Sequence, residues 1–474
     1  PSGKLPIELL SEIFLLCVED SMDDDNTIRI PLELSKICAR WRSAAISNPH
    51  LWSKLSVQLE GQSSNRHPEL VDTWLRRSAA CPLTFYLFWE NPPFDNTHPI
   101  LEKILEHSER WRTMFFYLPY RAFASFQRIR GRLPMLMNLS LGTADDGPLP
   151  PHSRQASLDM FELAPRLRSL ECVNISPTMF KFPWAQLQDI PLLSGNIVEC
   201  LDVLDRSKRL SKLSYIFVEG GPPAPHTILA TPVLPTAPGL PTPYPHIYHN
   251  QLTSLSIMTP PYNEFVDLSP LFPHIHLPNL ESLTICNLNS PFGNEFIQFL
   301  SNLHALRTLH LRKTSLPDDQ LVEGLKHLPS LTSLIVLTSS HTPRGGVGGG
   351  VATEQTVTRY LLEALTRNFF SEDAMEGMLL PRLKKLELTV SSAAARELDT
   401  FIDMLQSRLR SDEPESFVEF GGSSPMSSPS SEMSLARLEH VRVRPNINLD
   451  DEFLIRLVEL RDLGLEVEVE KIQE

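Results

Sequence analysis

The residues whose chemistry first suggests a site are four histidines near the middle of the chain. His246 and His249 are followed by His274 and His276. Imidazole is a common zinc ligand, but structural zinc sites set ligands at short, fixed spacings, usually with cysteine among them. These spacings match no standard zinc pattern and no cysteine accompanies them. We therefore predict no metal site and no cofactor.

Motifs for covalent or phosphate chemistry do not appear either. The sequence has no Gly-x-Ser-x-Gly elbow, no His-Glu-x-x-His and no kinase signature set. The glycine-rich run 345–350 lacks the Gly-Lys-Ser/Thr that completes a phosphate-binding loop. We expect a protein that is not an enzyme.

The composition of the chain limits the classes of partner that it can bind. The 474 residues are 42% hydrophobic, which allows a large core, and carry a net charge of −14, which argues against binding nucleic acid. Six cysteines form no Cys-x-x-Cys pair, which is typical of free thiols in a reducing compartment. No secretory leader and no apolar run long enough to span a membrane is visible. We expect a cytoplasmic or nuclear protein that does not bind a membrane.

A repeated apolar template organises most of the chain. Apolar residues recur at positions 0, 3, 6 and 8, and six segments fit fully, beginning at residues 133, 277, 303, 328, 380 and 435. Four degenerate segments begin at residues 164, 184, 207 and 249. The last two apolar positions alternate with period two, so both point to one face of a short strand. Helix-period stretches follow several segments: 294–302, 318–328, 355–370, 395–409 and 450–463.

Strand and helix in alternation predict an α/β fold with a curved parallel sheet. The Leu-x-x-Leu-x-Leu segments resemble leucine-rich repeats in their longer, ribonuclease-inhibitor-like form. The resemblance implies a horseshoe solenoid that binds proteins. Asn174 and Asn287 stand one place early relative to the asparagine of the family's turn.

The first fifty residues contain two amphipathic helices and a short apolar cluster. Residues 4–17 and 31–47 carry helical apolar stripes, Asn48-Pro49 ends the second, and Leu51-Trp52 follows. Three such elements are too few for an independent core. They therefore form either a docking module that needs a partner or a cap on one end of the solenoid.

The order Leu5-Pro6-x-Glu8-Leu9-Leu10-x-x-Ile13-Phe14, Ile37-Cys38-x-Arg40-Trp41-Arg42 and Pro49-x-Leu51-Trp52 resembles the F-box, in the F-box-like form common in fungal proteins. The resemblance covers residues 4–52, with a longer acidic linker at 19–31 than in the compact F-box. It implies binding to the Skp-type adaptor of an SCF ubiquitin ligase and, through it, to a cullin. The implied adaptor-binding or motif-core residues are Leu5, Pro6, Leu9, Leu10, Ile13, Phe14, Ile37, Cys38, Trp41, Leu51 and Trp52.

These patterns predict an F-box-like helical docking domain at 1–60, a linker and capping repeats at 61–132, and a leucine-rich-repeat solenoid at 133–474. Within the capping repeats we expect strands at 81–88 and 111–118 and a helix at 100–112. Breaker-rich insertions at 219–249, 339–353 and 411–434 are expected to be disordered loops. The first is rich in proline and is either a spacer or a polyproline ligand, and the last holds Ser-Pro pairs at Ser424 and Ser428 that could accept phosphate.

The predicted function is a substrate-recognition adaptor of an SCF-type ubiquitin ligase. The alternative is a leucine-rich interaction scaffold with no ligase role, in which the N-terminal helices act as a cap. The target is expected on the concave strand face, at solvent-facing positions beside the strand leucines. These are Glu281, Thr284, Arg307, His310, Ser333, Lys384 and Lys385, with Ser282, Thr308, Thr332, Ile335 and Glu387 in the same class.

Overall fold

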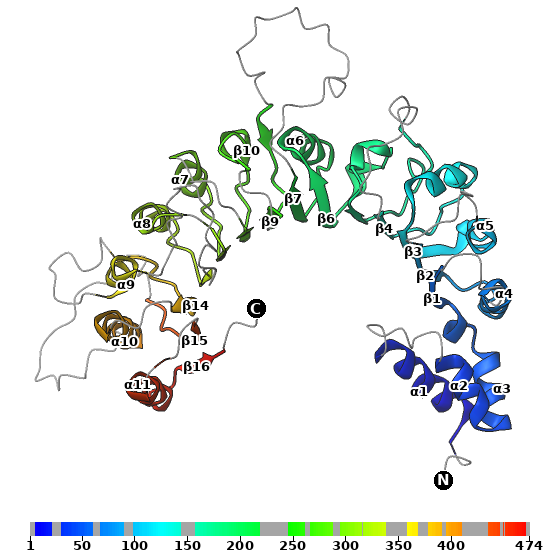
Figure 1. Cartoon of the computed structure of the whole chain (residues 1–474), viewed down its shortest axis with the longest axis horizontal. Helices are drawn as coiled ribbons and strands as arrows, with labels where there is room; N and C mark the ends of the chain where they lie inside the picture. The colour runs from blue at the N-terminus through cyan, green and yellow to red at the C-terminus, as the bar shows by residue number, and fades with distance from the viewer. Residues whose placement is uncertain are drawn as a thin grey trace, which may run out of the picture. The chain divides into compact units, whose positions relative to one another are not determined.

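The chain is seen in a computed structural model as a mixed α/β protein of parallel strands and helices (Figure 1). The structure describes residues 5–20, 30–59, 67–89, 98–143, 157–218, 245–260, 266–287, 294–314, 316–337, 358–367, 378–390, 395–409, 435–445, 449 and 451–470. By its contacts the chain divides into two units. The first comprises Pro1–Gly195 and Arg206–Leu213, and the second Asn196–Asp205 and Ser214–Glu474.

The first unit begins with three helices and continues as a parallel sheet. The helices α1 (Ile7–Asp20), α2 (Ile30–Ile37) and α3 (Ala39–Ser47) pack on one another and lead into a 3-10 helix, Pro49–Trp52. Neighbouring strands then pair in chain order. They are β1 (Lys54–Gln58), β2 (Leu83–Phe88), β3 (Trp111–Tyr117), β4 (Asn138–Gly142), β5 (Ser169–Val173) and β6 (Asp189–Gly195), and the connections include α4 (His67–Arg77), α5 (Pro99–Glu106) and 3-10 helices, the longest Tyr120–Ile129.

The second unit repeats strand and helix more regularly. Its strands also pair in parallel and in chain order. They are β9 (Ser254–Met258), β11 (Ser282–Cys286), β12 (Thr308–Arg312), β13 (Ser333–Leu337), β14 (Lys385–Val390), β15 (His440–Pro445) and β16 (Glu466–Val469). The helices are α6 (Ile197–Arg206), α7 (Asn294–Ser301), α8 (Asp318–Lys326), α9 (Arg359–Leu365), α10 (Ala395–Leu409) and α11 (Asp451–Asp462). A small separate sheet pairs β8 (Ile247–Tyr248) with β10 (Ile275–His276), and β7 (Lys212–Phe217) falls across the division.

The period-two pattern of the strands decides which side of each sheet is core. In β12, Leu309 and Leu311 are fully buried while Thr308 and His310 are partly exposed. The two preceding template positions, Leu303 and Leu306, are buried as well. A strand of five residues cannot bury this face alone, so each repeat is stabilised by its neighbours. The architecture of each unit is that of a leucine-rich-repeat-like solenoid.

The sequence template predicted the strands well. All ten segments end in an observed strand, β4, β5, β6, β7, β9, β11, β12, β13, β14 and β15. The predicted strands at 81–88 and 111–118 are confirmed as β2 and β3, and helices occur in all five predicted stretches. The predicted helix at 100–112 was too long, because α5 ends at Glu106 and Trp111 already belongs to β3.

Three template positions are not in the core, because Trp184, Leu192 and Leu435 are partly exposed. The template placed Leu192 in the core, but in β6 the buried side chain is Leu193 and Leu192 is partly exposed. Pro191 lies between Ile190 and this pair and has no N–H to donate to a neighbouring strand. The register with β5 shifts here, as in a β-bulge.

The two early asparagines have a clear structural role. Asn174 and Asn287 directly follow β5 and β11 and adopt left-handed backbone angles, φ 56° and 58°. Asparagine tolerates this region better than most residues. The side-chain amide of Asn287 also donates to the carbonyl of Thr259, 3.2 Å away, in the preceding repeat. The turn after β11 therefore joins adjacent repeats through the side chain of Asn287.

Several predictions fall outside the described residues: the insertions 339–353 and 411–434, most of 219–249, the glycine-rich run, and Ser424 and Ser428. The proposed division at residues 60 and 132 stays a prediction. Within the described residues, no helix is long and apolar enough to cross a membrane. The six cysteines are all free thiols.

A buried arginine stabilises the repeat that contains β14 through hydrogen bonds. Arg408 of α10 is 1% exposed, and its guanidinium donates to the carbonyl oxygens of Leu365, Leu379 and Leu380 at 2.7, 2.8 and 3.1 Å. Burial lowers the pKa of Arg408 to about 9, and these hydrogen bonds hold the charged form in place. One side chain thus donates to three backbone carbonyls from two segments, and of these the carbonyl of Leu380 also accepts the backbone N–H of Leu383.

We predict that Arg408→Ala destabilises this repeat by about 2 kcal/mol or more, since the carbonyls of Leu365 and Leu379 lose this donor and each buried carbonyl left without a donor costs about 1–3 kcal/mol. Hydrogen exchange should show lost protection in α10 and β14. The matched control is Arg359→Ala, which removes only an exposed ion pair with Glu363 and should cost less than about 0.5 kcal/mol. Equal protection in both variants would contradict the role given to Arg408.

Candidate interaction surfaces

Helix α1 has two apolar stripes, and within the described residues only one of them is buried. Leu10, Phe14 and Val18 recur at helical spacing and are 1%, 0% and 2% exposed. Beside them, Leu9, Ile13 and Leu16 are 50%, 41% and 61% exposed. These three side chains, here called the α1 stripe, are solvated in the described part of the chain. Ile37, at the end of α2, is 60% exposed as well.

The α1 stripe is held in place by the packing behind it. The ring of Phe14 lies 4.9 Å from that of Trp41 on α3. The guanidinium of Arg40 donates to the carbonyl of Leu5, and that of Arg42 donates to the carbonyl of Ser35 at 2.8 Å. The exposed stripe is therefore presented by a packed three-helix bundle.

The bundle is joined to the sheet through Trp52. This side chain is fully buried, and its indole N–H donates to the carbonyl of Ala45 at 2.8 Å. Its ring meets the edge of Trp74 on α4 at 4.7 Å, and the guanidinium of Arg77 lies 4.3 Å above it. Trp52 thus connects α3 to the first repeat within the first unit.

The structure separates the residues that the F-box resemblance named. Pro6, Leu9, Ile13, Ile37 and Cys38 are exposed, while Leu5 and Trp41 are partly exposed. Leu10, Phe14, Leu51 and Trp52 are at most 1% exposed, so they are motif-core residues and not surface contacts. Sequence reasoning missed Leu16, although its spacing of three from Ile13 and seven from Leu9 places it on the same helix face.

The predicted target-binding residues lie on the solvent side of the second unit's sheet. The parallel register aligns Thr284, His310, Ile335 and Glu387 in one row across β11 to β14. Ser282, Thr308, Ser333 and Lys385 form the adjacent row. The remaining predicted residues, Glu281, Arg307, Thr332 and Lys384, precede the strands. Burial lowers the pKa of His310, which favours its neutral form. That these positions bind a target stays a prediction.

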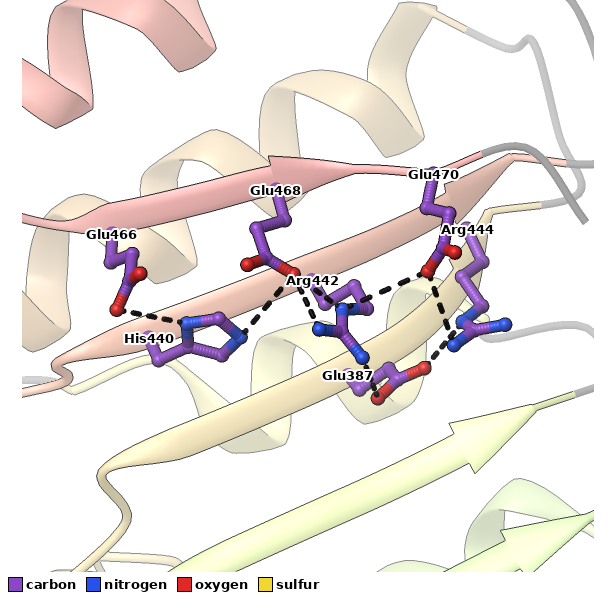
Figure 2. Close-up of polar contacts among 7 residues, drawn as sticks. All are labelled: Glu387, His440, Arg442, Arg444, Glu466, Glu468 and Glu470. Carbon is purple, nitrogen blue, oxygen red and sulfur yellow. Dashed lines mark hydrogen bonds and ion pairs between the residues drawn. The ribbon is translucent and has the colours of Figure 1, made fainter. Parts of the chain in front are cut away.

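A ladder of charges continues the same face at the end of the second unit (Figure 2). Arg442 on β15 lies 2.5 Å from Glu468 on β16 and 3.8 Å from Glu387 on β14. Arg444 pairs with Glu387 and, at 3.3 Å, with Glu470. Acidic side chains of β14 and β16 therefore flank basic side chains of β15, and this charge ladder adds to the backbone pairing of the strands. The sequence template missed β16, which contains no leucine.

The structure also shows which side chains come closest to a metal-binding arrangement. In the described residues this arrangement is formed by His440, Glu466 and Glu468, whose ligand atoms lie within 4.8 Å of one another. The four histidines near the middle of the chain, which were predicted to bind no metal, are not part of it. Glu468 is already paired with Arg442, so its charge is compensated. His249 instead accepts the backbone N–H of Leu252 at 3.1 Å and is buried, which is a structural role.

Comparison with known proteins identifies no family. No protein-family model matches the chain, and no curated protein matches it. Among solved structures, the crystal structure of an internalin from Listeria monocytogenes is similar, with a TM-score of 0.27 and 13% identity over 68% of this chain and 91% of the internalin chain. At that TM-score the similarity carries no inference about function.

We predict that the attachment of β16 depends on pH. Glu468 on β16 accepts a hydrogen bond from Arg442, and this bond lowers the pKa of Glu468 below its ordinary value of 4.5. The stabilisation from this carboxylate is therefore complete above that ordinary value and is lost as the pH falls through the lowered pKa of the folded state. Hydrogen exchange, corrected for its intrinsic pH dependence, should show steady protection of β16 from pH 7 to 5 and a loss below pH 4.

Arg442→Gln should weaken the protection of β16 at pH 7 and flatten its pH dependence. Lys384→Gln is the control, because Lys384 pairs with Glu439, 2.7 Å away, which precedes β15. The idea fails if Arg442→Gln leaves the pH profile of β16 unchanged.

Proposed function

We propose that this chain is a substrate-recruiting subunit of an SCF-type ubiquitin ligase. Its N-terminal bundle is an F-box-like domain that docks on a Skp-type adaptor and, through it, on a cullin. The repeats that follow the bundle form a leucine-rich-repeat solenoid of the ribonuclease-inhibitor-like form, whose solvent-facing sheet surface binds the target. The chain acts by binding, as a non-enzymatic protein without a cofactor, in the cytoplasm or the nucleus.

The observation that carries the docking role is the α1 stripe. Three large aliphatic side chains at helical spacing stay 41–61% exposed on a helix whose other stripe is fully packed. Burying one such side chain contributes about 1.5–3 kcal/mol, so an apolar partner surface would gain from covering all three. Leu9 and Ile13 are also positions at which the F-box resemblance implies adaptor contact. The geometry and the resemblance therefore favour the same surface.

The repeats support the second half of the proposal. Successive parallel strands present rows of partly exposed polar side chains in fixed register, as in the row from Thr284 to Glu387. A rigid surface loses little conformational entropy when it binds, and this favours protein recognition.

A scaffold without a ligase role is the second candidate, and the packing of Trp52 favours it. This ring closes the bundle onto α4 as a terminal cap would, through Trp74 and Arg77. Repeat proteins need such a cap for solubility. The two candidates differ in whether the α1 stripe binds anything.

Retention of a purified Skp-type adaptor by the full chain tests the proposal. We predict binding by the wild-type chain and a loss of about 10-fold or more for Leu9→Asp, because a charge would replace a buried apolar contact of about 1.4 kcal/mol or more. Melting temperature should not change, since Leu9 is half exposed. Calorimetry and co-elution give the two readouts.

Leu163→Asp is the matched control, because Leu163 is 51% exposed and lies outside the bundle. It should retain the adaptor. If the wild-type chain does not bind the adaptor, or Leu9→Asp binds it equally well, the ligase role is wrong. The cap role would then be supported if Trp52→Ala still lowers the melting temperature.

A further inference from the structure

Four aromatic side chains lie on the solvent side of the sheet in the first unit. Tyr86 and Phe88 on β2 and Phe115 and Tyr117 on β3 are each partly exposed and alternate with buried residues. Their ring centroids are 5.0 Å apart for Phe88 and Phe115, 6.1 Å for Tyr86 and Phe115, and 6.5 Å for Phe88 and Tyr117. We call these four residues the aromatic face.

The neighbouring strand is shaped to accept one of these rings. A Cβ atom at Gly142 on β4 would lie only 2.5 Å from Cδ2 of Tyr117. Real side chains do not approach so closely, so the ring of Tyr117 lies over the space left by this glycine. The ring of Tyr117 is thus held against β4.

A carboxylate lies in the same row, two strands away. The register aligns Tyr86, Phe115, Ser140 and Glu171 across β2 to β5. The hydroxyl of Ser140 donates to Glu171 at 2.6 Å, which orients the carboxylate. Among the described residues, none of the ion pairs found within 4 Å involves Glu171. Asp189 follows in the adjacent row and adds negative charge.

We propose that this surface binds an extended peptide that carries an apolar side chain and an arginine two positions apart. The inference rests on the proposed function and names the class of segment that the sheet would recognise in a target. The apolar side chain would lie on the aromatic face, and the guanidinium would pair with Glu171.

The spacing follows from strand geometry. Strands two apart are about 10 Å apart, and alternate residues of an extended peptide are about 7 Å apart. The length of an arginine side chain spans the remaining distance to the carboxylate. Arginine is preferred to lysine because its planar group binds a carboxylate through two hydrogen bonds and also stacks on aromatic rings. An acidic peptide would instead meet Glu171, Asp189 and the negative faces of the rings.

The test uses the full chain on an array of synthetic peptides. Each peptide has the form X-Ser-X within Gly-Ser flanks, with both X positions varied over all residues. We expect the strongest binding for peptides with one apolar residue and one arginine, at least 10-fold above the same peptides with glutamate in place of arginine. Phe115→Ser should lower all of this binding at least 10-fold. Glu171→Gln should abolish the preference for arginine and keep the preference for the apolar residue.

Lys54→Gln is the control, because Lys54 lies on the same side of β1 and outside the proposed contacts. It should leave the array pattern unchanged. The proposal would be overturned if the array shows no enrichment of arginine, or if it shows enrichment of acidic residues. It would also be overturned if Phe115→Ser and Glu171→Gln give the same binding pattern as the wild-type chain. Adaptor retention measured on the same variants separates the two ideas, since it should remain normal even if the peptide proposal fails.

Discussion

The structure depends on the register between neighbouring parallel strands. Leu283, Leu309 and Leu334 point to the core and are directly aligned, so each strand completes the apolar face of the next. Because side chains alternate with period two, this alignment also fixes the opposite side. The rows that contain His310 or Phe115 are consequences of the same constraint. A one-residue slip would bury these side chains and expose the leucines.

This constraint explains which parts of the fold the sequence could predict. Leucines at fixed spacing predict strands because burial selects them, and all ten segments contain one. β16 was missed because the two template positions that precede its valines are Arg461 and Gly464, and the bulge in β6 was missed because Pro191 acts through the backbone. On the surface, the pattern Leu-Thr-Phe-Tyr-Leu-Phe of β2 is almost continuously apolar. It predicts a strand but does not reveal that Tyr86 and Phe88 are partly exposed, which depends on the register of β2 with β1 and β3.

The N-terminal helix shows a similar limit. Apolar residues cover a wide arc of α1, and periodicity alone cannot divide the arc into a packed and an exposed part. The division depends on contacts from distant residues, such as Trp41 against Phe14. The F-box resemblance therefore named core and surface positions together. The exposed positions Leu9 and Ile13, with Leu16 beside them, are the ones at which a partner could act.

The connection between the two proposed surfaces bears on how such a subunit would work. Trp52 is packed against α3 and α4, and β1 begins two residues later. β2 and β3, which carry the aromatic face, are the next two strands of the same unit. Only one strand separates the aromatic face from the segment that follows the bundle, with no flexible linker between Trp52 and β1. A peptide held there would therefore keep a fixed orientation relative to a partner that covers the α1 stripe.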